Sequence, residues 1–406
     1  MRAAGARGGV CYGSSAMSDG AMTIDRVRRE RLTRQGLRRG ALRRPLVEAL
    51  SALVGVPMPV GACATLALFA RGLISRREEL DAAWLARGEL AAVPGPRGML
   101  WLCATADAPL LRSFAVADHA AREARVASAC ALTARDLLGA RDALREALAS
   151  PRRAEELRTL LPPALTRSLG TPGQRAGAVT LAGLVLRGMW CVGEVSRAPS
   201  SGRVDGETYV YGIDAHPRVT PNAAESVDLV AARWFSAHGP ATAKEFAAAF
   251  GIAAGRATAA LKSLGLRASP VDEETMLSPE GDEPSPWEAD EVALLGLRDP
   301  LTDANPSLSR WAEATVARAA QMRHLGPGPV VMVRGEIVGG WALDGDGRVV
   351  LRVRTEIDAV ARESLDRTRA ALEAFAVGAL GHAPALHGTV LPRALPPLTT
   401  EISGGL

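Results

Sequence analysis

The stretch HGPATAKEFAAAFGIAAGRATAALKSLG, residues 238–265, combines a short helical segment, a glycine turn and a longer helical segment. Thr242 is a natural helix N-cap, and Glu245 three residues later completes a capping box. Gly251 and Gly265 stand where glycine commonly ends a helix. The pattern predicts helices over 244–250 and 253–264, an order that is typical of a helix-turn-helix unit.

The flanking residues extend this unit into a winged-helix pattern. A helix is predicted over 227–237, and β-rich segments follow at 266–269 and 274–277. The same order, helices and then a hairpin, recurs upstream. Residues 24–114 end in predicted strands 89–93 and 99–104. Residues 115–224 combine helices at 116–130, 134–149, 151–160 and 180–187 with β-rich runs at 189–192 and 208–211. We therefore predict three winged-helix units, over 24–114, 115–224 and 225–278.

The two ends of the chain differ from these units. Residues 1–23 are small and rich in glycine and serine, without the apolar run of a signal peptide, and we expect disorder there. Met17 or Met22 is an alternative start to Met1. Residues 279–290 are rich in proline and acidic side chains and indicate a linker. Residues 291–406 predict strands over 330–341 and 349–353, with helices over 308–323 and 358–380.

The expected fold is mainly α with small β elements (α+β). It consists of tandem winged-helix domains and a small C-terminal β-barrel-like domain with helices.

Composition narrows the functional classes. The chain has 48 basic and 44 acidic residues, a net charge of +4, which is compatible with nucleic acid but does not require it. The five cysteines form no CxxC pair and no zinc-ligand spacing, so neither disulfides nor a metal site is expected. No run of eighteen apolar residues occurs, which excludes a predicted membrane helix. We expect a cytoplasmic monomer without membrane contact.

The most basic segment is 24–44, where nine arginines stand against Asp25 and Glu30. It reads as an amphipathic helix that is either a solvated face or a phosphate-binding surface. Basic side chains also occur on the helices and hairpin tips of the other predicted units. The candidate DNA-binding residues are Arg34, Gln35, Arg38, Arg39, Arg97, Arg203, Lys244, Arg256 and Lys262.

Six short motifs carry a family resemblance over most of the chain from about residue 24. They are RQGL (34–37), LALFAR (66–71), GEL (88–90), RGMLWL (97–102), HGPAT (238–242) and VRGEIVGGW (333–341). In this order and spacing they resemble the bacterial AlkZ/YcaQ-type winged-helix DNA glycosylases. The resemblance implies double-stranded DNA as the partner. It also implies removal of alkylated bases or unhooking of interstrand crosslinks, without a cofactor.

The resemblance also locates a departure from the family pattern. The family holds its hydrolytic water with two polar side chains in a Gln-X-Gln or Gln-X-Asp motif, and that motif falls here on Pro57-Met58-Pro59. Proline has no side-chain donor or acceptor, and a methionine sulfur is only a weak acceptor. Trp101 also stands where the family often has histidine. By itself, the phrase Gly55 to Pro59 predicts only a break between two helices.

Three hypotheses remain open from the sequence. The first is a DNA-binding member of this family whose base excision is lost or altered, with no catalytic residue at Pro57 or Pro59. The second is an active glycosylase that hydrolyses N-glycosidic bonds with non-standard residues, of which Glu48 and Asp81 are weak candidates. The third is a winged-helix transcriptional regulator or protein-interaction module.

Overall fold

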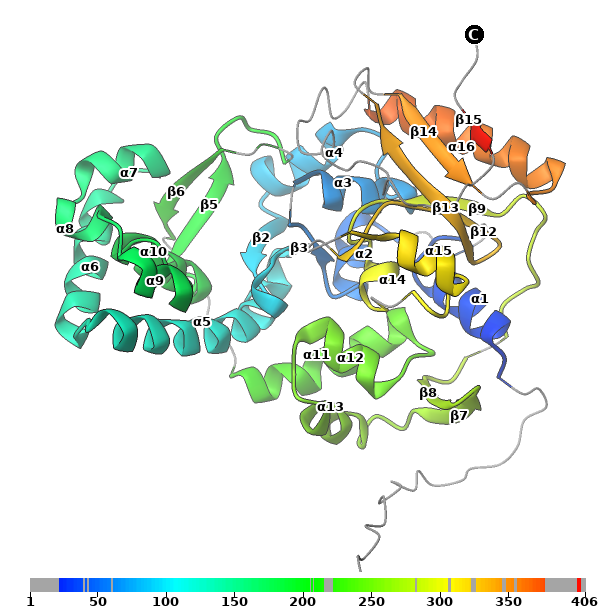
Figure 1. Cartoon of the computed structure of the whole chain (residues 1–406), viewed down its shortest axis with the longest axis horizontal. Coiled ribbons are helices and arrows are strands. Elements are labelled where there is room, and N and C mark those ends of the chain that lie inside the picture. Colours follow the sequence, from blue (N-terminus) through cyan, green and yellow to red (C-terminus); the bar gives the residue numbers. More distant parts are fainter. Residues whose placement is uncertain are drawn as a thin grey trace, which may run out of the picture.

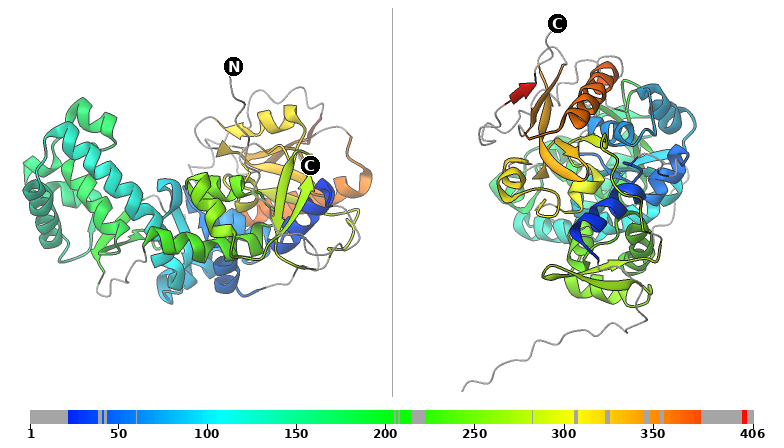
Figure 2. Two further views of the ribbon diagram at one scale, coloured as in Figure 1. Left: turned by 90° about the horizontal axis from the view of Figure 1, so that it is seen from below. Right: turned by 90° about the vertical axis from the view of Figure 1, so that its right-hand side faces the viewer.

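The computed structural model describes residues 22–376, apart from 39–40, 42–43, 60, 205, 207, 215–221, 282, 306–307, 323–325, 345–347 and 354–355, together with strand 400–402. The fold is mainly helical, with several small antiparallel sheets. Helices α6 to α10 form an arm that the long helix α5 joins to a larger body (Figure 1). The view from below shows the same arm and body (Figure 2).

The first unit packs helices against a three-stranded sheet. Its helices are α1 (Ile24–Arg34), α2 (Leu46–Ala52), α3 (Gly61–Ala70) and α4 (Arg77–Asp81), which continues as a π-helical turn, Ala82–Ala86. Its strands are β1 (Val56–Pro57), β2 (Leu90–Pro94) and β3 (Leu100–Ala104), in the order β1-β3-β2. Gly55 to Pro59 is therefore more than the predicted helix break, because Val56 and Pro57 pair with Leu102 and Trp101.

The second unit begins with α5 (Ala108–Cys130), a continuous helix that contains the predicted boundary at 114/115. It continues through α6 (Ala134–Ala147), α7 (Ala154–Leu160), α8 (Pro163–Thr166), α9 (Gly170–Ala176) and α10 (Leu181–Cys191). Strands β4 (Arg152–Arg153), β5 (Val195–Pro199) and β6 (Tyr209–Ile213) form a sheet in the order β4-β6-β5.

The predicted strand at 189–192 is wrong. Helix α10 continues to Cys191 because Met189, Trp190 and Cys191 are all buried against the unit's core and its surroundings. The helix ends only where Gly193 adopts a φ of +76°, a conformation that glycine tolerates best. β-Favouring composition was overridden here by helical packing.

The third unit follows its sequence pattern most closely. It contains α11 (Ala223–His238), α12 (Ala243–Phe250) and α13 (Ala254–Leu261), followed by the paired strands β7 (Arg267–Val271) and β8 (Glu274–Ser278). The capping box of Thr242 and Glu245 is present, and Gly251 ends α12 with a φ of +65°. Helix α13 is shorter than the predicted 253–264.

The C-terminal unit is organised by a five-stranded antiparallel sheet in the order β15-β14-β13-β12-β9. The strands are β9 (Val292–Leu295), β12 (Val330–Val333), β13 (Glu336–Leu343), β14 (Val349–Val353) and β15 (Thr400–Ile402). Short elements α14 (Pro300–Asp303), α15 (Ala314–Ala319), β10 (Gln321–Met322) and β11 (Gly326–Pro327) connect them, and α16 (Ala359–Phe375) packs beside the sheet. The predicted helix over 308–323 is therefore limited to 314–319. The barrel-like closure of this unit and the winged-helix assignment of the others stay predictions.

The predicted units share hydrophobic cores. One cluster joins the first unit to the C-terminal sheet and helix α16, as shown by Leu50, Leu68, Trp341 and Leu372. A second cluster joins the β2–β3 hairpin to α5 and the third unit. Each unit thus buries part of its apolar surface against a neighbour, which stabilises their relative placement.

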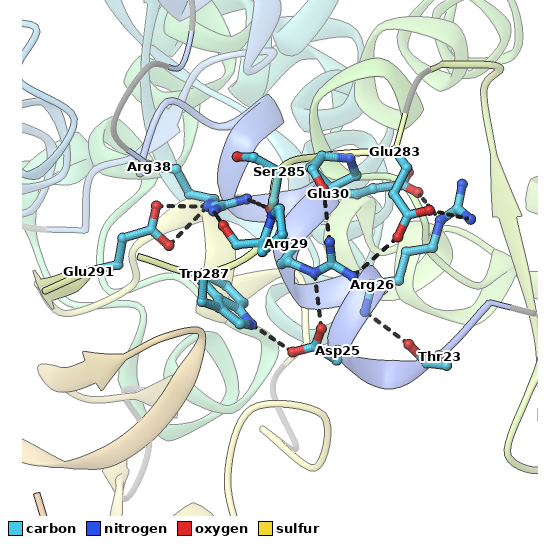
Figure 3. A network of polar contacts seen from close by, with 12 residues as sticks. Thr23, Asp25, Arg26, Arg29, Glu30, Arg38, Glu283, Ser285, Trp287 and Glu291 are labelled. Atoms are coloured by element: carbon cyan, nitrogen blue, oxygen red, sulfur yellow. Dashed lines mark hydrogen bonds and ion pairs between the residues drawn. The ribbon is translucent and has the colours of Figure 1, made fainter. Parts of the chain in front are cut away.

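Residues 283–287 of the predicted linker 279–290 contact helix α1 and Arg38 (Figure 3). Glu283 pairs with Arg26 at 3.6 Å and with Arg29 at 3.3 Å. The carbonyls of Ser285 and Pro286 accept hydrogen bonds from Arg38. Much of the positive charge of the segment 24–38 is consequently neutralised within the chain.

Helices long and apolar enough to cross a membrane are absent from the described residues. Cys63, Cys103, Cys130 and Cys191 are not joined in disulfide bonds. Cys11 lies outside the described part of the chain.

Candidate functional site

Pro57 faces a small cavity rather than an open active site. Strand β1 is buried, and the cavity of about 20 Å³ is lined by Pro57, Trp101, Trp234, Phe250 and two polar residues, His238 and Asp303. A space of this size holds about one water molecule and no nucleobase. Met58 is fully buried in the core, whereas Pro59 is exposed.

The histidine of this cavity is uncharged. His238 is buried, stacks on Trp234 with ring centroids 4.9 Å apart, and its Nδ1 lies 3.0 Å from Nε2 of Gln35. Burial, reinforced by the positive charges of Arg31 and Arg71, lowers the pKa of His238 to about 3. The neutral ring has one acceptor nitrogen and one donor nitrogen, and it supplies no positive charge near neutral pH.

The carboxylate of this cavity is held by two arginines. Asp303 is buried at the C-terminal end of α14, and its two oxygens accept from Arg97 and, at 2.8 Å, from Arg298. Arg97 adopts a φ of +59° in the β2–β3 turn, and its side chain lies against Gly251 at the end of α12. The turn therefore contacts both the third unit and the C-terminal unit.

Gly98, the next residue of the turn, is approached by two arginines that the sequence did not single out. The Nη2 atoms of Arg122 on α5 and Arg187 on α10 both lie 3.8 Å from the point that a β-carbon on Gly98 would occupy. Arg187 also donates to the carbonyl of Gly98 at 2.8 Å. No carboxylate pairs with either arginine within the described residues.

The electrostatic effect of Arg122 and Arg187 extends to a neighbouring histidine. Burial is the main cause that lowers the pKa of His119, and the positive charges of Arg187 and Arg122 lower it further, against the opposing effect of Glu123. Two neighbouring guanidinium groups without a carboxylate partner favour a bound anion such as a phosphate. Helical periodicity could not reveal this pair, because Arg122 and Arg187 are 65 residues apart in the sequence. Only the tertiary fold brings them together at Gly98.

The predicted DNA-binding residues of the α1 region are largely engaged within the chain. Gln35 bonds His238 and accepts from Arg71 at 2.8 Å. Arg38 is buried, donates to both oxygens of Glu291 and stacks over Trp287 at 4.7 Å. Arg34 keeps one ion pair, to Glu30 at 3.3 Å, and is partly exposed. Arg39 lies outside the described residues.

The remaining predicted DNA-binding residues lie in several environments. Lys244 on α12 and Lys262 at the end of α13 are exposed. Arg256 pairs with Asp228 at 2.9 Å. Arg203 lies in the β5–β6 loop, which packs on the first unit because Val204 is buried in the core and donates to Asp81 at 2.7 Å.

The two carboxylates proposed from the sequence as catalytic candidates do not line the Pro57 cavity. Glu48 is exposed on α2. Asp81 accepts from Arg77 and from the backbone of Val204, so it holds the β5–β6 loop. The carboxylate at the cavity is Asp303, which sequence spacing could not connect to Pro57.

A second, larger cavity gathers Arg34, Gln35 and Arg38. Its volume is about 550 Å³, and residues of α16 that the sequence did not single out complete its wall. Groups of three or more histidine, cysteine, aspartate or glutamate side chains arranged to hold a metal do not occur among the described residues.

Comparisons with known proteins give a family and a similar fold. The family model described as "DNA glycosylase AlkZ-like" matches residues 50–376. No curated protein matches the chain. The solved structure of the Streptomyces sahachiroi DNA glycosylase AlkZ is similar, with a TM-score of 0.66 and 17% sequence identity. The match covers 88% of this chain and 98% of that one, and at this identity it establishes likeness of fold.

Proposed function

Because the chain belongs to the AlkZ-like DNA glycosylase family, we propose that it binds double-stranded DNA as a cytoplasmic monomer and that its base-excision activity is lost or strongly reduced. The observation that carries the proposal is the Pro57 cavity. The two prolines at the motif positions have no side-chain group that could hold a water, and the space beside Pro57 is too small for a base.

The chemistry of N-glycosidic hydrolysis explains why this matters. The attacking water must be oriented and partly deprotonated while positive charge develops on the sugar. A loss of one such polar group typically lowers the rate by about 10²- to 10³-fold. Residues 57 and 59 both lack polar side chains here. The carboxylate oxygens of Asp303 accept hydrogen bonds from Arg97 and Arg298 instead.

DNA contact is supported by cations that lie on neighbouring parts of the fold. Arg122 and Arg187 flank the β2–β3 turn, whereas Lys244 and Lys262 are exposed on the third unit. Each phosphate contact releases counterions, so affinity for duplex DNA should fall steeply with salt.

Two assays test the proposal with the full chain. Fluorescence anisotropy with a labelled duplex should give salt-dependent binding. A base-release assay with duplexes that carry alkylated bases or an interstrand crosslink should give no turnover. Binding that is absent at low salt would refute the DNA-binding part. Turnover well above the uncatalysed rate would refute the loss of activity.

Asp303 is the specific observation in favour of the second candidate, an active glycosylase with non-standard residues. It is the carboxylate that shares a cavity with Pro57, and that cavity has room for one water. In this case base release should occur and Asp303→Asn should abolish it. Asp290→Asn is the matched control, because Asp290 does not line this cavity.

A further inference from the structure

The cavity of about 550 Å³ is larger than the Pro57 cavity and has a different lining. It lies between the first and the C-terminal units, and residues of α1, α2, the end of α3, strand β9 and helix α16 line it. Its volume falls in the range of small-molecule sites, which often lie between structural units. Leu53 and the hydrogen bond from Gln35 to His238 separate it from the Pro57 cavity.

The wall of this cavity is strongly basic. Five arginines line it, and among the described lining residues there is no aspartate or glutamate. Arg38 and Arg71 have buried partners, Glu291 and Asp299, behind the wall. The other three arginines are Arg44, Arg367 and the partly exposed Arg34, which pairs at 3.3 Å with Glu30 outside the cavity lining.

These three arginines have capacity for an anion. Arg44 is exposed and makes no ion pair with any residue in the described part of the chain. Arg367 is 54% exposed, and its partners Glu363 and Asp290 lie outside the cavity. The Nε of the buried Arg71 also has no hydrogen-bond partner within the described residues. Guanidinium groups that line one cavity favour a phosphate there.

The floor of the cavity is apolar and partly aromatic. Leu53, Leu73, Leu294 and Leu372 contribute to it, and Phe69 lines it while stacking on Phe375 at 4.1 Å. Such a floor accepts a flat ring, since bases stack on aromatic and apolar surfaces. The hydroxyls of Ser364 and Thr368 donate to backbone carbonyls and keep lone pairs for a donor on the ligand.

We propose that this cavity binds a nucleoside monophosphate, with the phosphate at Arg34, Arg44 and Arg367 and the base over Phe69. A free nucleotide and the 5′-phosphorylated end of a DNA strand share this chemistry. The proposal stands apart from duplex binding, because the arginines at Gly98 do not line this cavity.

Isothermal titration of the full chain with deoxyadenosine 5′-monophosphate tests the proposal. The dissociation constant should lie below about 100 µM. Deoxyadenosine and inorganic phosphate should each bind at least about tenfold more weakly, because each lacks one half of the recognised group. Equal binding of either fragment, or no binding of the nucleotide at about 1 mM, would overturn the proposal.

Two comparisons of variants locate the binding. Ala371→Trp should block the cavity, and Ala370→Trp, one residue outside the lining, should leave binding unchanged. Arg367→Gln combined with Arg44→Gln should weaken binding about tenfold or more, whereas Arg362→Gln should not. Nucleotide binding that is unaffected by Ala371→Trp would refute this location.

A single-stranded oligonucleotide, with and without a 5′-phosphate, identifies the source of the nucleotide. Competition with the nucleotide that requires the 5′-phosphate supports a DNA end. If the nucleotide binds but the phosphorylated oligonucleotide does not compete with it, a free nucleotide is supported. Duplex affinity of Ala371→Trp should match that of the unmodified chain. If the unmodified chain binds the nucleotide but not the duplex, the proposed function alone is refuted.

Discussion

Replacement of Glu245 by glutamine removes the charge at the centre of a buried polar network. Its carboxylate accepts from Arg31 at 3.0 and 2.8 Å, from Asn305 at 2.9 Å and from Arg310 at 3.2 Å. It also accepts from the backbone of Thr242 at 2.8 Å. These contacts join α1, the cap of α12 and the C-terminal unit, so the substitution weakens three parts of the fold together.

The magnitude follows from the pKa of this carboxyl. Burial acts to raise the pKa of Glu245, but Arg31 and Arg310 outweigh it and lower the pKa from 4.5 to about 2. This difference corresponds to about 3 kcal/mol of stability near neutral pH. The folded-state pKa is the lower one, so this contribution is complete above pH 4.5 and is lost as the pH falls toward 2. Removal of one partner of a buried ion pair typically destabilises a protein by a similar amount, about 3 to 5 kcal/mol.

Hydrogen exchange measured by mass spectrometry suits this test, because a chain of several units need not unfold in one step. Peptides from α1 and α12 should exchange about 150-fold faster in Glu245→Gln at pH 7, the equivalent of about 3 kcal/mol. The exposed Glu273→Gln in the β7–β8 turn is the matched control. An acceleration below about tenfold, or one that is equally large at pH 3, would refute the reasoning.

Three further outcomes are expected. The double variant Arg122→Gln, Arg187→Gln should lower the salt slope of duplex binding by about two, and an unchanged slope in anisotropy titrations would contradict phosphate contact there. Asp81→Ala should leave the buried N–H of Val204 without its acceptor and destabilise the β5–β6 loop by about 1–3 kcal/mol. Hydrogen exchange around 199–206 should therefore become faster, whereas Glu78→Ala on the same helix should leave it unchanged. The pKa of His238 is lowered to about 3, so between pH 6.5 and 3 the unfolded chain binds a proton that the folded chain does not, and stability should fall with pH. In His238→Gln, the melting temperature should fall less over this pH range.

Local signals in the sequence were reliable where a few neighbouring residues decide the structure. The capping box of Thr242 and Glu245 and the left-handed Gly251 are present as predicted, because both involve contacts within three or four residues. Strands β2 and β3 also lie where their composition indicated. The run 189–192 was misassigned because its burial against the core, rather than its intrinsic preference, decides the helix.

Charge in the sequence was a poorer guide to function than charge in the fold. The nine arginines of 24–44 suggested a phosphate surface, yet Arg38 is paired with Glu291, 253 residues away, and Arg29 with Glu283. Conversely, no sequence pattern indicated Arg122 or Arg187, although both side chains approach Gly98. Whether an arginine can still bind a phosphate depends on carboxylates far away in the sequence, which a local sequence pattern cannot show.

The sequence by itself determined the helical order of the third unit, the family resemblance and the absence of polar side chains at Pro57 and Pro59. These follow from residue identity and short spacing. Tertiary structure decided that Pro57 faces a one-water cavity with His238 and Asp303, and that five arginines surround a ligand-sized cavity beside α16. Cavities and pairing form between elements distant in the chain, so only the packed fold specifies them.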